Sequence, residues 1–313
     1  MGQIAKINNI EIWWEDFGNK KDPTVLLIMG ANANCMLWPD NLISSLVEKG
    51  FHVVKFDNRD VGKSTWIGKK PFYVDLLPKF LLKRFISFIF KLAFDKEGRF
   101  KALNSPGLYS LSDMAQDAVC LMDHIKTDKA HVVGLSMGGM IAQVMALEHP
   151  ERMLTMTPIM STPGISNPNL PGPTKDFKEA IEKSFDYTLE GQEEESLTTV
   201  YKGLAGSRFP FNKTKFREEL RGVIDHGYNP YTKHGESVSG SYDRLNKLSK
   251  INIPTLVIHG DEDPILPLEH GLALADNIPD SKKVILKGVG HEIPEELLTE
   301  TINHLVNHFN SIK

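Results

Sequence analysis

Cysteine is scarce in this sequence, with Cys35 and Cys120 the only two among 313 residues. Two cysteines are too few for a disulfide framework or a cysteine-rich metal centre. The chain also lacks a large excess of one charge, because its formal net charge is −4 and charged residues make up 24% of it. We therefore expect no metal, no organic cofactor and no nucleic-acid partner.

Targeting signals are missing from the first residues as well. They contain no long apolar segment of the kind found in secretory signals. Lys6 stands where the myristoylation pattern needs serine or threonine. We therefore expect a cytoplasmic protein, and the length is sufficient for one large core with an inserted subdomain.

Apolar, β-branched segments alternate with segments of helical periodicity along most of the chain. Strands are expected at 9–17, 24–29, 51–56, 130–135, 153–160, 255–259 and 283–287, and helices at 40–49, 111–125, 140–149, 268–277 and 294–309. The spacing of Ser110 and Asp113 predicts a capping box at the start of the second helix. This alternation predicts an α/β fold, with a mostly parallel central sheet and helices on both faces.

Two segments depart from the alternation. Residues 164–250 are rich in proline, glycine and charge, and they show short helical pieces without a buried strand. We expect a mainly helical cap there, inserted into an α/β core formed by residues 1–163 and 251–313. Residues 68–107 form a second insertion within that core, and it is basic and aromatic.

A serine flanked by glycines follows the expected strand at 130–135. The sequence from Gly134 to Gly138 reads G-L-S-M-G and leads into a helix-forming stretch. A strand, a tight turn and a helix with this G-x-S-x-G pattern form a nucleophile elbow, which exposes the serine hydroxyl above the sheet. A glycine-rich turn with a helix-capping serine is the simpler alternative. Ser136 is nevertheless the first candidate for covalent catalysis.

A base and an orienting acid should follow the serine, the acid first and then a histidine. His291 lies in a glycine-rich loop after the last expected strand, and imidazole is the natural general base near neutral pH. Three acids follow the preceding strand: Asp261, Glu262 and Asp263. We choose Asp263, with Asp261 as the second choice, to hold the imidazole in the productive tautomer.

Small residues after the strand at 24–29 suggest where an oxyanion would bind. The backbone N–H of Ala31 and that of Met137 could together hold the oxygen of a tetrahedral intermediate. Asn32, Asn34 and Trp38 follow closely and are candidates for the substrate pocket. For these three residues, packing in the core or loop is an equally good interpretation.

These motifs resemble the α/β-hydrolase family, and within it the aclacinomycin methylesterase branch. The similarity rests on Trp38-Pro39, on the run from Asp57 to Ser64, on the elbow, and on the run from His259 to Ile265. The resemblance implies that Asp263 is the triad acid and that Ala31 and Met137 form the oxyanion hole. The long insertion at 68–107 and the different cap composition depart from the branch, so its polyketide-ester substrate is not carried over.

We therefore predict a serine hydrolase of the carboxylesterase type, acting on small to medium esters that include lipophilic ones. Ser136 is the nucleophile, His291 the base and Asp263 the acid that orients it. A lactonase, a C–C bond hydrolase or a perhydrolase could use the same three residues. A binding protein that uses the same cavity without catalysis is the alternative from another class.

The insertion contains one further pattern. Between residues 80 and 94, Lys83, Arg84, Ser87 and Lys91 recur at helical spacing, and most other positions are apolar. Three charges within fifteen residues exclude a membrane-spanning helix. The apolar side could pack on the cap or on a second subunit in a homodimer, or it could contact a lipid interface.

Overall fold

The computed structural model of the chain describes residues 2–312. Its eight strands are β1 (Gln3–Ile7), β2 (Ile10–Phe17), β3 (Thr24–Ile28), β4 (His52–Phe56), β5 (Ala130–Leu135), β6 (Met153–Ile159), β7 (Leu256–Gly260) and β8 (Lys282–Leu286). They form one sheet in the order β1-β2-β4-β3-β5-β6-β7-β8. The pairings of β1 with β2 and of β2 with β4 are antiparallel, and the other pairings are parallel. The predicted mostly parallel sheet is confirmed.

Eleven α-helices surround the sheet or lie beyond its edge in the described part of the chain. They are α1 (Asp40–Glu48), α2 (Tyr73–Leu76), α3 (Lys79–Leu92), α4 (Leu111–His124), α5 (Met137–Glu148), α6 (Lys175–Leu189), α7 (Glu193–Leu204), α8 (Lys213–Gly227), α9 (His234–Ser239), α10 (Leu268–Asn277) and α11 (Leu298–Phe309). Short 3-10 turns occupy Cys35–Leu37, Pro150–Arg152, Leu245–Lys250 and Glu295–Leu297.

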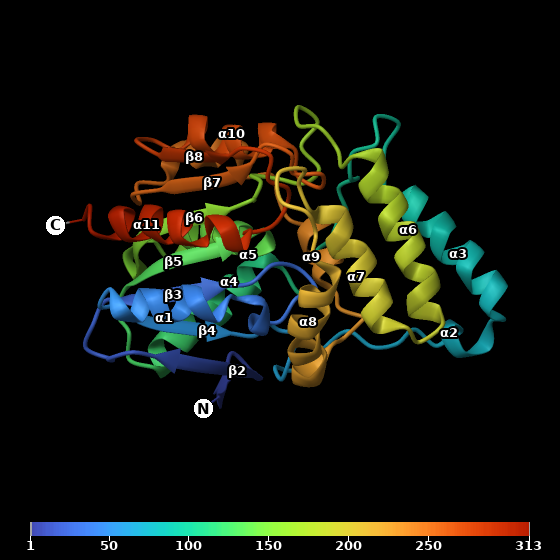
Figure 1. Cartoon of the computed structure of the whole chain (residues 1–313), viewed down its shortest axis with the longest axis horizontal. Coiled ribbons are helices and arrows are strands. Elements are labelled where there is room, and N and C mark those ends of the chain that lie inside the picture. Colours follow the sequence, from blue (N-terminus) through green and yellow to red (C-terminus); the bar gives the residue numbers. More distant parts are fainter. Residues whose placement is uncertain (1, 313) are drawn as a thin grey trace.

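The hydrophobic core is divided between the two faces of the sheet, as expected for a parallel sheet covered on both sides. On one face the buried residues of α4, α5 and α10 pack against the strands, Met114, Ile141 and Leu274 among them. The other face is covered by α1 and α11, through residues such as Leu46 and Leu305. Figure 1 shows α1 and α11 in front of the strands.

Helices α6 to α9 follow β6 and precede β7, and we call them the inserted helices. In Figure 1 they lie beyond one end of the strands, with α2 and α3 farther out beside α6. The sequence predicted only short helical pieces here, whereas α6 and α8 each span 15 residues. These two helices have few apolar positions, so their hydrophobic periodicity is weak in the sequence. The side chain of Thr174 caps α6 and that of Asn212 caps α8.

Other elements also differ from the sequence prediction, among them α11, which begins at Leu298, four residues later than expected. Strand β1 was not predicted, because it is short and mostly exposed; it pairs with β2 through a tight turn in which Asn8 and Asn9 adopt φ angles of 46° and 62°. Helix α5 begins at Met137, three residues earlier than expected, directly after the serine. The capping box of Ser110 and Asp113 is confirmed.

Candidate active site

Ser136 occupies the turn between β5 and α5, close to the middle of the sheet. Its φ and ψ are 55° and −115°, a conformation that a residue with a side chain rarely adopts. The turn is held by the Ser136 N–H, which donates to Ile159 O at 2.8 Å, and by Ser161 Oγ, which donates to Ser136 O at 2.8 Å. Such backbone strain costs on the order of 1–3 kcal/mol and recurs at functional sites.

The glycines beside the serine are required by close backbone contacts. A Cβ at Gly134 would lie 2.2 Å from the carbonyl of Gly138, and a Cβ at Gly138 would lie 2.0 Å from Ile28 O in the neighbouring strand. No side chain fits at either position.

Asp263 and His291 meet at the end of the sheet where β7 and β8 finish. Their Oδ2 and Nδ1 atoms are 2.6 Å apart, and both side chains are almost fully buried. The other carboxylate oxygen of Asp263 accepts the N–H groups of Ile265 and Leu266 at 3.0 and 2.8 Å. The carboxylate is thus fixed from both sides, with one oxygen directed at the imidazole.

The second candidate acid, Asp261, lies elsewhere. Its carboxylate accepts the Gly288 N–H at 2.7 Å and pairs with Lys287 Nζ at 3.0 Å. These contacts hold the pKa of Asp261 below its usual value, against a partial opposing effect of desolvation. Asp261 therefore stabilises the loop that carries the histidine, whereas Asp263 contacts the imidazole.

Ser136 Oγ and His291 Nε2 are not joined by a hydrogen bond in residues 2–312. Hydrogen bonds between catalytic groups are often long in the free protein and tighten when the reacting complex forms. The two residues follow β5 and β8, whose carboxyl ends lie at the same edge of the parallel sheet.

The loop after β3 passes directly beside the serine. A Cβ on Gly30 would lie 3.3 Å from Ser136 Cβ. Ala31 is the next residue in this loop. Within the described residues no acceptor is found for the backbone N–H of Ala31 or of Met137. Met137 is the first residue of α5, where N–H groups have no partner in the helix and the helix dipole favours negative charge.

The three residues expected at the pocket have different surroundings. Trp38 is buried in the core cluster shared with α1, and Asn34 caps the 3-10 turn at Met36 and donates to Val223 O and Gly227 O in α8. These contacts match the packing alternative for both side chains. Asn32 is exposed, with a φ of 61°. A substrate contact for any of the three stays a prediction.

Sequence reasoning missed His234, a buried histidine at the start of α9. Its Nδ1 accepts the Asn32 N–H at 2.9 Å, and its Nε2 donates to Arg59 O at 2.8 Å. Burial lowers the pKa of His234 to about 4, because the charged imidazole would lose its hydration. The inserted helices thus hold the loop that carries Ala31 through a neutral histidine.

A second histidine–aspartate pair was also missed. His226 of α8 donates from Nε2 to Asp57 Oδ2 at 2.7 Å, and Asp57 also accepts the N–H groups of Cys35 and Lys63. Cys35, Asp57 and His226 place ligand-type atoms within 4.8 Å of one another. However, burial first and Asp57 second raise the pKa of the Cys35 thiol well above its usual value, so the thiol stays protonated. We interpret this cluster as an anchor between α8 and the core.

The segment from Leu204 to Arg208, after α7, contacts the loops of both Asp263 and His291. Leu204 O accepts the His291 N–H at 2.8 Å, and Arg208 N–H donates to Gly288 O at 2.9 Å. Ser207 donates from N and Oγ to Glu262 at 2.7 and 2.8 Å, and Gly206 N–H donates to Glu292 at 3.1 Å. Burial raises the pKa of Glu292.

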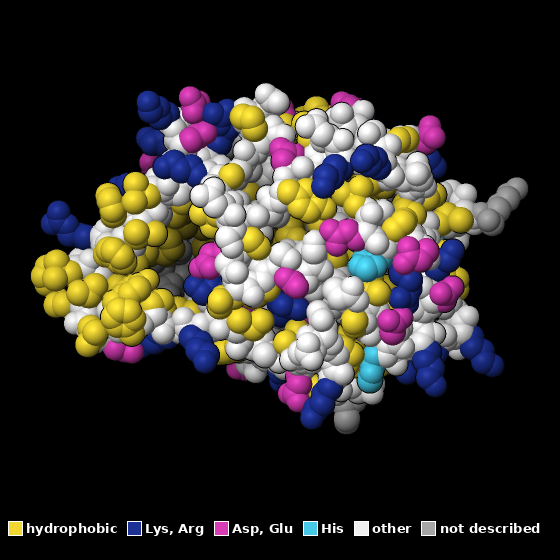
Figure 2. Space-filling model, turned by 180° about the vertical axis from the view of Figure 1, so that it is seen from behind, with side chains coloured by type: hydrophobic (Ala, Val, Ile, Leu, Met, Phe, Trp, Pro, Cys, Tyr) yellow, Lys and Arg dark blue, Asp and Glu magenta, His cyan; other side chains and the backbone are white. Residues whose placement is uncertain are grey.

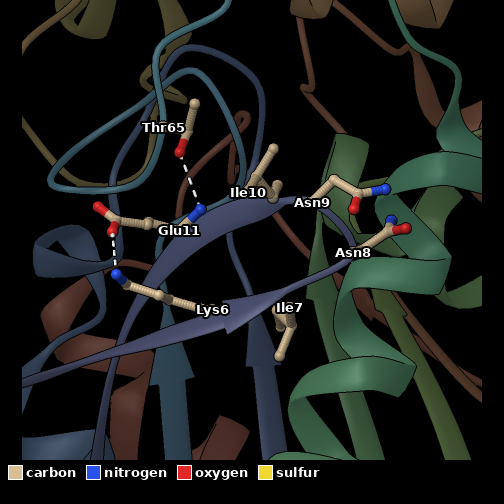
Figure 3. A pocket seen from close by; sticks show the side chains of 7 residues that line it. All are labelled: Lys6, Ile7, Asn8, Asn9, Ile10, Glu11 and Thr65. Carbon is tan, nitrogen blue, oxygen red and sulfur yellow. Dashed lines mark hydrogen bonds and ion pairs between the residues drawn. The ribbon is translucent and has the colours of Figure 1, made fainter.

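A surface hollow of about 500 Å³ lies away from these residues, around the turn between β1 and β2. Figure 3 shows the side chains that line it: Lys6, Ile7, Asn8, Asn9, Ile10, Glu11 and Thr65. Their polar groups are largely paired with one another or with Asp117. None of Ser136, Asp263 and His291 lines this hollow, so we do not place the reaction there.

Comparison with known proteins identifies the family. A family model described as the alpha/beta hydrolase fold matches residues 23–296. The chain is 26% identical over 309 residues to rhodomycin D methylesterase from Streptomyces sp. (strain C5), covering 92% of this chain and 91% of that protein. It is 32% identical over 179 residues to 2-hydroxy-6-oxo-6-phenylhexa-2,4-dienoate hydrolase from Burkholderia cepacia, covering 55% and 59%.

Solved structures show the same architecture. A thermophilic esterase from Thermogutta terrifontis matches with a TM-score of 0.71 at 19% identity, covering 100% of this chain and 99% of that chain. This similarity reports the fold, and the family match extends from before β3 to beyond β8. The predicted fold and the resemblance are thereby confirmed: the chain belongs to the α/β-hydrolase family and is a hydrolase.

Proposed function

We propose that the chain is a carboxylic ester hydrolase that works through an acyl-enzyme intermediate on Ser136. The observation that carries this is the 2.6 Å contact between Asp263 Oδ2 and His291 Nδ1, at the same edge of the sheet as the strained serine turn. An imidazole whose Nδ1–H is held by a buried carboxylate directs Nε2 outward as the proton acceptor. The rhodomycin D methylesterase is named for an ester reaction, which favours this chemistry.

The reaction proceeds in two halves. His291 takes the proton of Ser136 as Oγ attacks the ester carbonyl, and Asp263 stabilises the resulting imidazolium. The N–H groups of Ala31 and Met137 hold the oxyanion of the tetrahedral intermediate, and one such donor contributes about 3–4 kcal/mol. His291 then protonates the departing alcohol and activates water to release the acid. Every step is assigned to groups of the chain itself.

The substrates would be small to medium esters, with lipophilic ones included. The segment between α7 and α8 adds an aromatic side chain, since Phe209 packs on the core cluster that contains Val289 in the loop after β8. Met36 and Leu37 join the loop after β3 to the cluster of Phe216 and Leu220 in α8. These apolar surroundings suit an uncharged acyl or alcohol group.

A C–C bond hydrolase on the same residues is the second candidate. It is favoured by the 32% identity to the dienoate hydrolase, although that match covers little more than half of each chain. Such an enzyme also needs a serine, a histidine and an oxyanion site. A panel of p-nitrophenyl esters beside a meta-cleavage product would separate the two, because turnover of only the second would reject the esterase.

Hydrolysis of p-nitrophenyl acetate and butyrate tests the proposal directly. We expect Ser136→Ala and His291→Ala each to retain less than about a tenth of kcat, since removing either group disables the acyl transfer. Ser44→Ala at an exposed position of α1 and His304→Ala at a half-exposed position of α11 serve as matched controls. Full activity in Ser136→Ala would reject the nucleophile. A wild type with no turnover above that of Ser136→Ala would instead favour a binding protein.

A further inference from the structure

Helix α3 turns its apolar side away from the protein. Six of its apolar residues are exposed, with Phe80 at 67% and Phe88 at 58%, and α2 and its preceding turn add Phe72 at 79% and Leu76 at 72%. We call these side chains the α2–α3 face, and its members are Phe72, Leu76, Phe80, Leu81, Phe85, Phe88, Ile89 and Leu92. Figure 2 shows the hydrophobic side chains gathered on this projecting end of the molecule.

Three polar residues of the same helix contact α6, although both lysines among them are more than half exposed. Lys83 Nζ lies 2.6 Å from Asp186 Oδ2 in α6, and Ser87 Oγ donates to Glu182 Oε1 at 2.9 Å. Lys91 Nζ lies 3.4 Å from Glu182, and Phe90 packs edge-on against Phe185. A surface helix of a globular protein normally buries its apolar stripe and exposes its charges. In α3 Leu82 is buried, and the ion pairs add to the contact with α6. Six other apolar residues of the helix are left outside.

The segment that carries this face is basic, although four of its cations pair with acids: Lys70, Lys83, Lys91 and Arg99. Residues 69–101 contain nine Lys or Arg and three Asp or Glu, whereas the whole chain carries −4. Lys79 and Arg84 lie on the exposed part of α3, and neither has an acidic partner within ion-pair distance in the described residues. Aromatic and aliphatic side chains with basic neighbours are the pattern of helices that lie in an anionic lipid interface.

A second copy of the chain would fit this surface less well. In a symmetric dimer the same patch contacts itself, so Lys79 and Arg84 of both copies would come together around the apolar contact. Like charges brought together at an interface are unfavourable. Anionic phospholipid headgroups instead offer the opposite charge to these same side chains.

We propose that the α2–α3 face binds the surface of anionic phospholipid bilayers. The apolar side chains enter the boundary between headgroups and acyl chains, while Lys79 and Arg84 contact lipid phosphates. No helix in residues 2–312 is long and apolar enough to cross a bilayer. The contact is therefore peripheral, with α3 lying in the plane of the interface.

Vesicle flotation of the full chain tests the proposal. Vesicles of phosphatidylcholine alone are compared with vesicles that also contain phosphatidylserine, at low and high salt. We expect the protein to float with the anionic vesicles and to be released in part by salt, which screens the contribution of Lys79 and Arg84. Ser136→Ala should float as the wild type does, because binding needs no turnover; this separates the result from that on the hydrolase activity.

Two variants locate the contact. Phe80→Ser/Phe88→Ser should lower the vesicle-bound fraction at least about tenfold, because two large apolar groups no longer enter the interface. Lys79→Gln/Arg84→Gln should abolish the preference for phosphatidylserine. Leu108→Ser, at an apolar position 63% exposed outside the face, and Lys49→Gln/Lys129→Gln are the matched controls and should bind as the wild type.

Three outcomes would overturn the proposal. The first is recovery of the wild type in the soluble fraction with both kinds of vesicle. The second is equal flotation of the wild type and Phe80→Ser/Phe88→Ser, which would place the contact elsewhere. The third is a wild-type dimer in sedimentation that Phe80→Ser/Phe88→Ser converts to a monomer, which would assign the face to a second copy. All of these substitutions are at exposed positions, so a circular dichroism melt should show unchanged folding.

Discussion

The backbone N–H of Asn32 donates to Nδ1 of His234 at 2.9 Å, across 202 residues of sequence. Nε2 of the same imidazole donates to Arg59 O, so the ring is fixed as the Nε2–H tautomer. One uncharged side chain of the inserted helices thereby bridges the two loops that follow β3 and β4. Since Ala31 precedes Asn32, the ring also sets where the proposed oxyanion donor lies.

Removal of this bridge should affect turnover more than substrate affinity. We expect His234→Gln to lower kcat for p-nitrophenyl acetate about tenfold or more with little change in KM. The Ala31 N–H stabilises only the transition state, so its displacement slows the reaction without weakening substrate binding. Steady-state kinetics measure this division. An increase in KM alone would indicate that His234 shapes the pocket without positioning the loop.

Stability should fall in mildly acidic solution. Burial lowers the pKa of His234 and that of His131 from 6.5 to about 4. Between these values the unfolded chain binds more protons than the folded one, so stability is full above pH 6.5 and is lost as the pH falls toward 4. Each histidine accounts for on the order of 3 kcal/mol of this loss.

Urea unfolding at about pH 7 and about pH 5 measures the effect through the midpoint concentration. His131→Gln removes one titrating group while keeping a polar partner for Thr155, and it should reduce the pH dependence. His304→Gln, at a half-exposed position, is the control variant. A midpoint that is independent of pH in the wild type would contradict the assignment.

The two candidate acids give a matched comparison. Asp263→Asn should lower kcat by a factor of about 10³–10⁴, because the amide no longer stabilises the imidazolium and favours the wrong tautomer. Asp261→Asn should stay within about twofold of the wild type, since its carbonyl oxygen can still accept the Gly288 N–H. An equal loss of kcat in both variants would mean that the loss reflects a less stable loop and not the contact between Asp263 and His291.

The elbow glycine offers a test of fold stability. Gly134→Ala brings a Cβ to 2.2 Å from the Gly138 backbone, and we expect it to destabilise the protein by more than about 3 kcal/mol. Gly222→Ala, in α8 with open space around it, should raise stability by about 0.5–1 kcal/mol. Thermal melts of the two variants should therefore shift in opposite directions.

Asp57 should prove essential for attaching α8 to the core. Asp57→Ala leaves two backbone N–H groups and His226 Nε2 without an acceptor, and we expect a loss of at least about 3 kcal/mol. Asp225→Ala changes the exposed neighbour of His226 and should cost less than about 0.5 kcal/mol. Chemical unfolding of both variants gives the comparison.

Local patterns were sufficient to predict seven of the eight strands, most of the core helices and the glycine-bounded turn at Ser136. These predictions succeed because hydrophobic periodicity and the close backbone contacts of a tight turn depend on residues that are near one another in the sequence. The pairs Asn32–His234 and Asp57–His226 lie 202 and 169 residues apart. Their partners depend on how the inserted helices fold back, and no spacing in the sequence encodes this.

Helix α3 shows the same limit in another form. The helical spacing of polar and apolar residues between 80 and 94 was visible in the sequence. This spacing does not say which side of the helix packs against the rest of the protein. The orientation follows from Asp186 and Glu182 on α6, which pair with the lysines of α3. Those acids lie about a hundred residues away in the chain, so only the tertiary structure reveals an outward apolar side.

The hydrogen bonds between residues 204–208 and the loops of Asp263 and His291 have a kinetic consequence. Because Leu204 O accepts the His291 N–H, any shift of residues 204–208 would also move the backbone of His291. The rate of the proposed acyl transfer therefore depends on how this segment packs, although none of its residues takes part in the reaction.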